Sequence, residues 1–328
     1  MNITTLSRAT VLALSIAAVG LTGLSAAPAR AAAPMVKKSA PGYYRMMLGD
    51  FEITALSDGV FQAPVDKLLN NATPSAVQEA LAKSFMTTPM DMSVNGFLVN
   101  TGSKLILIDS GAGSFFGPTL GRLQANLRAA GYAPEQVDEI YITHMHLDHV
   151  GGLVGGAERF FPNAIVRADS KEAGFYLSPA KMDEALATGT DEAKTQFRGA
   201  TAVLSPYVKA GKFKPFEGDT ALTAGIKTMS SYGHTPGHTT YVVESKGQTM
   251  IFWGDVMHVA PVQFADPSIT ILWDTDNKVA RAARQKVFAE AAQDGHMIGA
   301  AHVSFPGLGH MRSEGKGYVW VPVNYSPL

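Results

Sequence analysis

The sequence predicts an α/β fold in which two mixed β-sheets pack face to face and helices cover both outer sides. Short apolar or alternating segments, typical of strands, occur in two successive halves of the chain, and each half continues into segments with helical spacing. After the first 31 residues, no repeat of fixed period and no low-complexity linker interrupts the chain. The pattern therefore indicates one layered domain rather than several.

The first half is predicted to begin with a hairpin whose turn is Gly49-Asp50. In that half, strands are expected at 43–48, 51–57, 95–100, 105–108 and 140–143, and helices at 74–84 and 122–130. In the second half, strands are expected at 240–244, 250–253 and 297–301, and a helix at 278–293. The segments 111–118 and 188–200 are expected to be loops.

The first 31 residues have the composition of a secretory signal peptide. Arg8 provides a positive start, an apolar run covers 9–27, and Ala29-Arg30-Ala31 is a small-x-small cleavage site. The alternative is a transmembrane anchor, which the polar and glycine residues within the run disfavour. We therefore expect an exported protein, periplasmic or secreted, whose mature part is a single domain over 32–328.

Composition excludes several classes of function. The chain has no cysteine, so neither a disulfide nor a thiolate nucleophile is available. The formal net charge is −1 and no dense run of Lys or Arg is present, which argues against nucleic-acid partners. No segment after the leader is apolar for long enough to span a membrane.

The densest cluster of potential metal ligands follows the strand predicted at 140–143. His144, His146, Asp148 and His149 lie within six residues, in a chain that holds nine histidines. At a strand end, His144 and His146 point the same way, and the glycines at 151–152 permit the tight turn that brings round the other two. Imidazoles and a carboxylate on one turn suit zinc or a similar divalent ion, whereas chance clustering on a surface is rare.

This H-x-H-x-D-H pattern after a short strand resembles the signature of the metallo-β-lactamase superfamily. The resemblance implies an αββα sandwich and three further ligands: His234 in a G-H-T-P-G-H stretch, Asp255 in a G-D pair, and His302 after a late strand. It assigns one metal to His144, His146 and His234 and the second to Asp148, His149 and His302, with Asp255 bridging the two. Asp109, in an I-D-S-G turn, is expected to support the ligands from behind. His238, His296 and His310 are not expected to bind metal.

Such a site predicts a hydrolase that uses two divalent ions. Zinc is the default for a His-rich set, and Mn, Co or Fe is compatible at one position. Two ions lower the pKa of a water between them, so that a bridging hydroxide is available at neutral pH. Asp255 is expected to orient this hydroxide and to take part in its proton transfer. No G-x-S-x-G nucleophile elbow is present as an alternative.

A closer resemblance links the chain to the exported methyl parathion hydrolases and their dihydrocoumarin-type lactonase relatives. The similar segments are 40–46, 48–59, 136–143 and 314–318. In that family aromatic side chains line the substrate mouth, and Phe116, Tyr176 and Phe197 occupy those positions here. From the sequence alone, each of the three is equally compatible with the core.

Three departures from the parathion hydrolases bear on the substrate. Leu68 stands where they carry Arg, and His258 and Trp273 stand where they carry Leu. We expect His258, three residues after Asp255, to face the site and, together with Trp273, to narrow the pocket. A flat lactone or aryl ester fits a narrow pocket better than a tetrahedral phosphotriester does.

The sequence therefore predicts a small-molecule lactonase or arylesterase. The first alternative is an organophosphate triesterase, and the more remote one is a metal-binding scaffold without catalysis. A homodimer is implied only by the resemblance.

Overall fold

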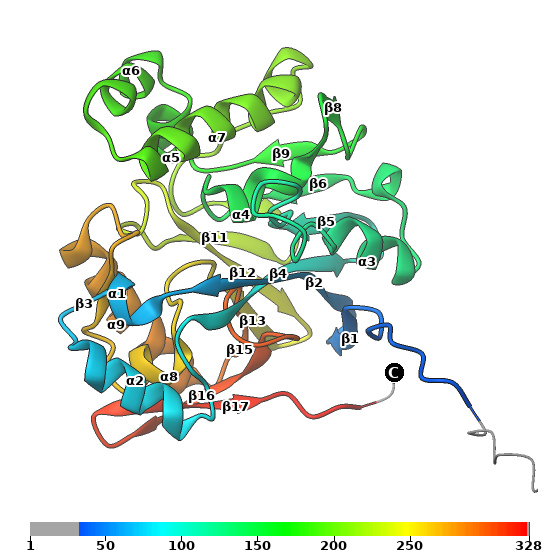
Figure 1. Ribbon diagram of the computed structural model, residues 1–328. Helices are drawn as coiled ribbons and strands as arrows, with labels where there is room; N and C mark the ends of the chain where they lie inside the picture. The colour runs from blue at the N-terminus through cyan, green and yellow to red at the C-terminus, as the bar shows by residue number, and fades with distance from the viewer. Residues whose placement is uncertain (1–32, 327) are drawn as a thin grey trace, which may run out of the picture. The chain divides into compact units, whose positions relative to one another are not determined.

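Two mixed β-sheets form the centre of residues 40–328 (Figure 1). The first sheet has the order β1 (Tyr43–Leu48), β2 (Phe51–Ala63), β4 (Met90–Asn100), β5 (Leu105–Ile108), β6 (Glu139–Tyr141) and β9 (Ile165–Arg167). The second has the order β10 (Ala221–Thr223), β11 (Ile226–Ser230), β12 (Thr239–Ser245), β13 (Gln248–Phe252), β15 (Met297–Gly299), β16 (Leu308–Glu314) and β17 (Gly317–Pro322). Two short pairs lie outside them: β3 (Leu69–Asn70) with β14 (Thr270–Ile271), and β7 (Val154–Gly155) with β8 (Glu158–Arg159). The predicted two-sheet architecture is confirmed.

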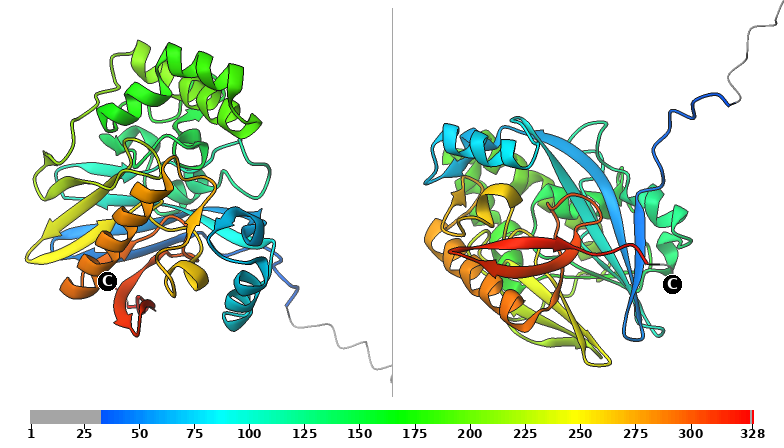
Figure 2. Two further views of the ribbon diagram at one scale, coloured as in Figure 1. Left: turned by 90° about the vertical axis from the view of Figure 1, so that its left-hand side faces the viewer. Right: turned by 90° about the horizontal axis from the view of Figure 1, so that it is seen from below.

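Helices cover the outer faces of both sheets (Figure 2). They are α1 (Val65–Leu68), α2 (Pro74–Lys83), α3 (Leu123–Ala129), α4 (Leu147–Val150), α5 (Ser170–Tyr176), α6 (Pro179–Thr188), α7 (Asp191–Lys209), α8 (Ala260–Gln263) and α9 (Asn277–Asp294). Apolar residues of α3, α4 and α7 pack on the first sheet, for example Leu127 and Leu204 in one cluster with Leu107. On the opposite side, Phe288 of α9 packs with Ile251 and Ile298 of the second sheet.

The core between the sheets is apolar and largely aromatic. Phe97 of the first sheet contacts Phe252 of the second with ring centroids 5.0 Å apart, and Tyr141 stacks on Tyr241 at 5.4 Å. All four rings are buried. Because burial of aromatic and aliphatic side chains is the main favourable term in folding, this layer fixes the two sheets against each other.

The structure is a computed structural model that describes residues 33–326 and 328. The predicted signal peptide, 1–31, lies outside the described residues. Within the described part, no helix combines the length and the hydropathy that crossing a bilayer requires.

Several elements differ from their predicted bounds. β2 continues six residues beyond the predicted end at Ser57, because a shift of register between Ser57 and Gly59 keeps it paired with β4. The segment 188–200 is not a loop. Its greater part belongs to α7, where Thr190 caps the first turn and the buried side chains of Phe197, Ala200 and Leu204 recur at helical spacing.

The strands deliver the candidate ligands to one edge of the sandwich. β5 and β6 run parallel in the first sheet, and β13 and β15 run parallel in the second. Their carboxyl ends lead to Asp109, to the 144–149 loop, to Asp255 and to His302, respectively. The carboxyl ends of parallel strands meet at one edge, which is where α/β proteins bind their ligands.

Asp58 anchors the loop that leads to this edge. The side chain is buried in β2, and its carboxylate accepts hydrogen bonds from the backbone N–H groups of Ala112, Gly121 and Leu123 at 2.9, 2.9 and 3.0 Å. Asp58→Ala leaves these donors without an acceptor. We therefore expect the free energy of unfolding to fall by about 3 kcal/mol or more in urea denaturation. The exposed control Asp50→Ala should change it by less than about 0.5 kcal/mol, and equal effects of the two substitutions would contradict this assignment.

Candidate metal centre

The H-x-H-x-D-H segment forms a loop and one helical turn directly after β6. His144 and His146 lie on the extended part, and Asp148 and His149 lie on α4. The N–H of His149 donates to the carbonyl of His146 at 3.0 Å, which closes the turn. This turn places all four side chains on the same side of the loop.

The seven predicted ligands come together in two groups that share Asp255. The first group is His144, His146, His234 and Asp255, and the second is Asp148, His149, His302 and Asp255. In each group, the potential ligand atoms lie within 4.8 Å of one another. His234 Nε2 is 3.1 Å from His146 Nδ1, and His149 Nε2 and His302 Nε2 are each 3.1 Å from Asp255 Oδ1. Such separations suit atoms that share one ion with bonds of about 2 Å.

The chemistry of the donor set fits metal ions better than it fits a closed hydrogen-bond network. His144 Nε2, His149 Nε2 and Asp255 Oδ1 are buried and have no hydrogen-bond partner. A buried polar atom without a partner costs free energy, so in native proteins it is normally explained by a ligand. Three histidines and a carboxylate on one side, and two histidines and two carboxylates on the other, are ligand sets typical of zinc and similar ions.

The charges in the centre also prepare it for cations. Burial lowers the pKa of His146 to about 3 and that of His144 well below its ordinary value, so both rings are neutral. At His149 burial acts in the same direction, but Asp255, Asp148 and Asp109 outweigh it and raise the pKa well above the ordinary value. Because a ligating imidazole must be neutral, binding of a metal ion at this cluster displaces a proton from His149.

Buried acceptors orient the ligand rings from behind. Asp109 Oδ2 lies 2.8 Å from His149 Nδ1, and both of its oxygens also accept hydrogen bonds from Thr143. The Ser93 carbonyl lies 2.7 Å from His302 Nδ1. A partner on the second ring nitrogen fixes the tautomer, and thereby presents the lone pair of Nε2 to the metal.

His234 is oriented by an acidic residue that the sequence did not indicate. Asp274 Oδ1 lies 2.9 Å from His234 Nδ1, and the buried guanidinium of Arg284 lies 3.6 Å from Asp274 Oδ2. Asp274 follows β14 and belongs to no recognisable motif, so only its position in space identifies it. Together, Asp274 and Arg284 connect α9 to the first cluster.

His238 has the structural role that the sequence predicted. Its Nε2 accepts a hydrogen bond from the backbone N–H of Asp255 at 2.9 Å, and its Nδ1 lies 2.8 Å from the Ser231 hydroxyl. Gly254, immediately before Asp255, has a φ of 52° and lies so close to His238 that a Cβ would be 2.8 Å from Nε2. His238 therefore holds the backbone of the shared carboxylate without being a ligand.

His258 lies elsewhere than the sequence predicted. It does not line the pocket. Its side chain is fully buried, Nε2 lies 3.0 Å from Asp255 Oδ2, and the ring stacks on that of His302 with centroids 5.3 Å apart. The spacing of three residues from Asp255 does bring the two side chains together, but the chain then turns towards α8, and the backbone N–H of His258 donates to Gln263. His258 thus contacts the shared carboxylate rather than a substrate.

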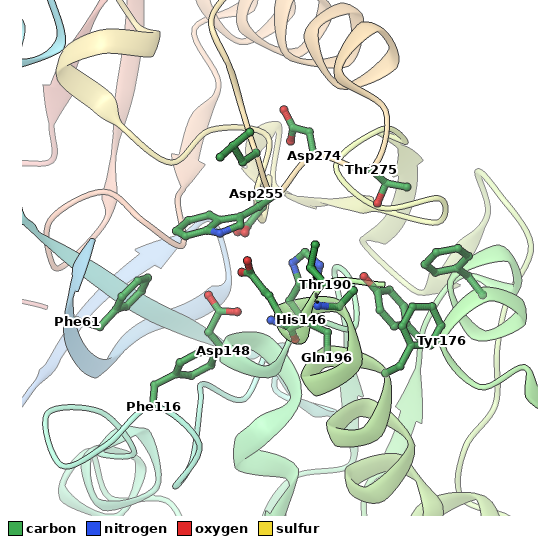
Figure 3. A pocket seen from close by; sticks show the side chains of 16 residues that line it. Phe61, Phe116, His146, Asp148, Tyr176, Thr190, Gln196, Asp255, Asp274 and Thr275 are labelled. Atoms are coloured by element: carbon green, nitrogen blue, oxygen red, sulfur yellow. Dashed lines mark hydrogen bonds between the residues drawn. The ribbon is translucent and has the colours of Figure 1, made fainter. Parts of the chain in front are cut away.

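The other predicted pocket residues do line a cavity beside the metal centre. The cavity has a volume of about 300 Å³ and is reached by His146, Asp148 and Asp255, ligands from both clusters. Figure 3 shows Phe61 and Phe116 next to Asp148, and Tyr176 on the far side of His146. The cavity is lined by Phe61, Phe116, His146, Asp148, Phe175, Tyr176, Thr190, Glu192, Ala193, Gln196, Phe197, Asp255, Leu272, Trp273, Asp274 and Thr275.

Two aromatic groups flank the metal centre. On one side Phe61 stacks on Phe116 with centroids 6.1 Å apart and lies 6.4 Å from Trp273. On the other side Tyr176 packs on Phe197 at 5.0 Å and lies 5.9 Å from His146. Sequence reasoning missed Phe61 because it ended β2 too early, and the residue belongs to the extension of that strand.

Comparisons with known proteins agree with this geometry. Residues 90–302 match the metallo-β-lactamase superfamily. The solved hydrolase AbOPH, of the β-lactamase superfamily, is 39% identical, with a TM-score of 0.82 over 88% of this chain and 100% of its own. The dizinc quorum-quenching lactonase AidC is 26% identical, with a TM-score of 0.80 over 87% of this chain and 99% of its own.

Curated relatives match over shorter regions. Ribonuclease TTHA0252 of Thermus thermophilus is 27% identical over 186 residues, which are 56% of this chain and 40% of that protein. An N-acyl homoserine lactonase of Bacillus cereus is 25% identical over 130 residues, which are 40% of this chain and 42% of that protein. The matches thus span about two fifths of the length of these relatives.

Asp109 provides a test of ligand orientation. Asp109→Asn retains a side chain that tolerates the φ of 55° at this position, but removes the charge that faces His149. We expect the affinity for the more weakly bound metal ion to fall about 10-fold to 100-fold, as measured by competition with a chromophoric chelator. The exposed control Asp183→Asn in α6 should bind metal as the unmodified protein does. Unchanged affinity in Asp109→Asn would show that Asp109 does not orient His149.

Proposed function

Because the chain belongs to the metallo-β-lactamase superfamily, we propose that it is a dinuclear metal-dependent hydrolase that opens lactones and cleaves aryl esters. The observation that carries the proposal is the position of the cavity. Ligands of both clusters reach it, and most of its remaining wall is aromatic. A small, flat, apolar substrate can therefore rest on the aromatic rings with its reacting carbonyl next to both metal sites.

The charges of the cavity favour a neutral substrate. Among its described lining residues there is no Lys or Arg, and the acidic Glu192 stands at its edge. A phosphodiester backbone or a phosphomonoester would meet no positively charged side chain apart from the metal sites. This supports a neutral ester, lactone or phosphotriester over a nucleic acid, although a ribonuclease is among the relatives.

The residues of the chain have separate tasks in the proposed hydrolysis. When bound, two divalent ions supply an activated water and polarise the substrate carbonyl. The aromatic groups hold the substrate, and Asp255 lies where it can accept a proton from the attacking water. His258 donates to Asp255 from the side away from the cavity and so orients that carboxylate. The carboxylate released from a lactone would be repelled by Glu192, which favours its release.

The preference for a planar acyl group over a phosphotriester rests on Trp273. This ring lies between Phe61, at 6.4 Å, and His258, at 5.5 Å, and occupies space beside Asp255. A tetrahedral phosphotriester extends in more directions from its reacting atom than a lactone does, so the indole excludes it more strongly. The similarity to AidC, a dizinc lactonase, supports the same choice.

The proposed substrate preference can be measured directly. We expect kcat/KM of the zinc-loaded protein for dihydrocoumarin to exceed that for methyl parathion by at least about 100-fold, because only the lactone fits beside Trp273. Side-by-side initial rates test this, with the metal-free protein as control. A higher value for methyl parathion would favour the organophosphate triesterase, and a metal-loaded protein without activity on either substrate would favour a binding scaffold.

Trp273 is expected to determine this preference. Trp273→Leu enlarges the cavity and should raise kcat/KM for methyl parathion relative to dihydrocoumarin by about 10-fold. Phe115→Leu is a matched control, because Phe115 is an exposed aromatic residue of the neighbouring loop that does not line the cavity. A ratio that stays the same in Trp273→Leu, or shifts equally in Phe115→Leu, would mean that the indole does not set specificity.

A further inference from the structure

Glu172 is a buried acid that lies between the two loops carrying the histidines of the first cluster. Its side chain, on α5, is fully buried. The backbone N–H of Met145 donates to Oε1 at 2.7 Å, and the backbone N–H of Gly237 donates to Oε2 at 2.9 Å. Met145 separates His144 from His146, and Gly237 follows His234 by three residues. One carboxylate is therefore bonded to both loops, one oxygen to each.

The contact between Gly237 and α5 leaves no room for adjustment. A Cβ at position 237 would lie 2.3 Å from the backbone nitrogen of Glu172 and 2.6 Å from its Cβ. Such distances do not occur between real atoms, so glycine is required for this approach. The loop that carries His234 is thus packed directly on the backbone of α5 as well as bonded to the Glu172 carboxylate.

The two loops have different origins, which makes a link between them necessary. His144 and His146 follow β6 of the first sheet, whereas His234 follows β11 of the second. Sub-ångström placement of ligands matters for metal affinity, because the ion demands its own bond lengths and angles. The third ligand-bearing segment, which carries His302, is instead oriented by Ser93, and none of the recorded Glu172 bonds reaches it.

We propose that Glu172 is a positioning residue that sets the spacing of the two histidine loops and thereby controls metal binding at the first cluster more than at the second. The inference rests on the metal binding in the proposed function but not on the choice of substrate. α5 also carries Phe175 and Tyr176 in the cavity wall, so the same helix supports both the first cluster and one aromatic group.

The test measures zinc binding site by site in Glu172→Gln, which keeps the size of the side chain but turns an amide N–H towards one of the two backbone donors. We expect the affinity of the first cluster to fall about 10-fold to 100-fold and that of the second to change by less than about 3-fold. Chelator competition gives the affinities, and anomalous diffraction from crystals at limiting zinc assigns them to sites. The visible absorption of the cobalt(II)-loaded protein should also change, since it reports ligand geometry.

Glu139→Gln is the matched control. Glu139 is a buried acid on β6, paired with Lys104 and 3.8 Å from Arg167, and it contacts neither histidine loop. It should lower stability without altering the relative occupancy of the two sites. Glu172→Asp, too short to reach both loops, should lower first-cluster affinity as Glu172→Gln does, and it decides the question if Glu172→Gln does not fold.

Three outcomes would overturn the inference. Equal losses at the two clusters, or a loss of stability with site occupancies and cobalt spectrum unchanged, would make Glu172 an ordinary structural residue. An unmodified protein that binds no zinc would remove both this inference and the proposed function. An unmodified protein that binds two zinc ions, together with Glu172 variants that do the same with unchanged affinities, would remove this inference alone.

Discussion

The carboxylate of Asp255, buried among five histidines, is the constraint on which the rest of this structure depends. His149, His258 and His302 approach its oxygens to 3.0–3.2 Å, and His234 and His144 lie at 3.4 and 3.6 Å. Their charges hold the pKa of Asp255 well below its usual range, despite burial, which acts to raise it. Converging lone pairs and unpartnered buried atoms are costly unless cations occupy the space between them. The centre is therefore built for metal ions, and the surrounding elements serve to bring its ligands together.

The sandwich meets this constraint by using both sheets. Asp109 and the 144–149 loop come from the ends of adjacent parallel strands in the first sheet, and Asp255 and His302 come from such ends in the second. The aromatic layer between the sheets fixes their relative position, and side chains that bridge loops complete the alignment. His238 holds the backbone of Asp255, Asp274 holds His234, and Glu172 joins the two histidine loops. Helices α5 and α7, which form one wall of the cavity, thus belong to the support of the metal centre as well.

The sequence predicted what local patterns encode and missed what depends on distant contacts. The H-x-H-x-D-H motif sits at a strand end and identifies its ligands by spacing alone, and resemblance extended the set to His234, Asp255 and His302. Glu172 contacts residues 27 and 65 positions away, and Asp274 contacts one 40 positions away, so no local pattern marks either. For His258, the spacing of three from Asp255 correctly suggested proximity but not direction, because the turn into α8 places its ring behind the carboxylate. For α7, the capping residue Thr190 and the apolar spacing were present in the sequence but were read as a loop.

The most direct test of the central claim is the metal content of the purified protein and of Asp255→Ala after equilibration with zinc and removal of the excess, measured by mass spectrometry of the element. The shared carboxylate predicts two zinc ions per chain in the unmodified protein and fewer than one in Asp255→Ala, because both clusters lose a ligand. One ion or none in the unmodified protein, or two retained in Asp255→Ala, would contradict a dinuclear centre organised by Asp255.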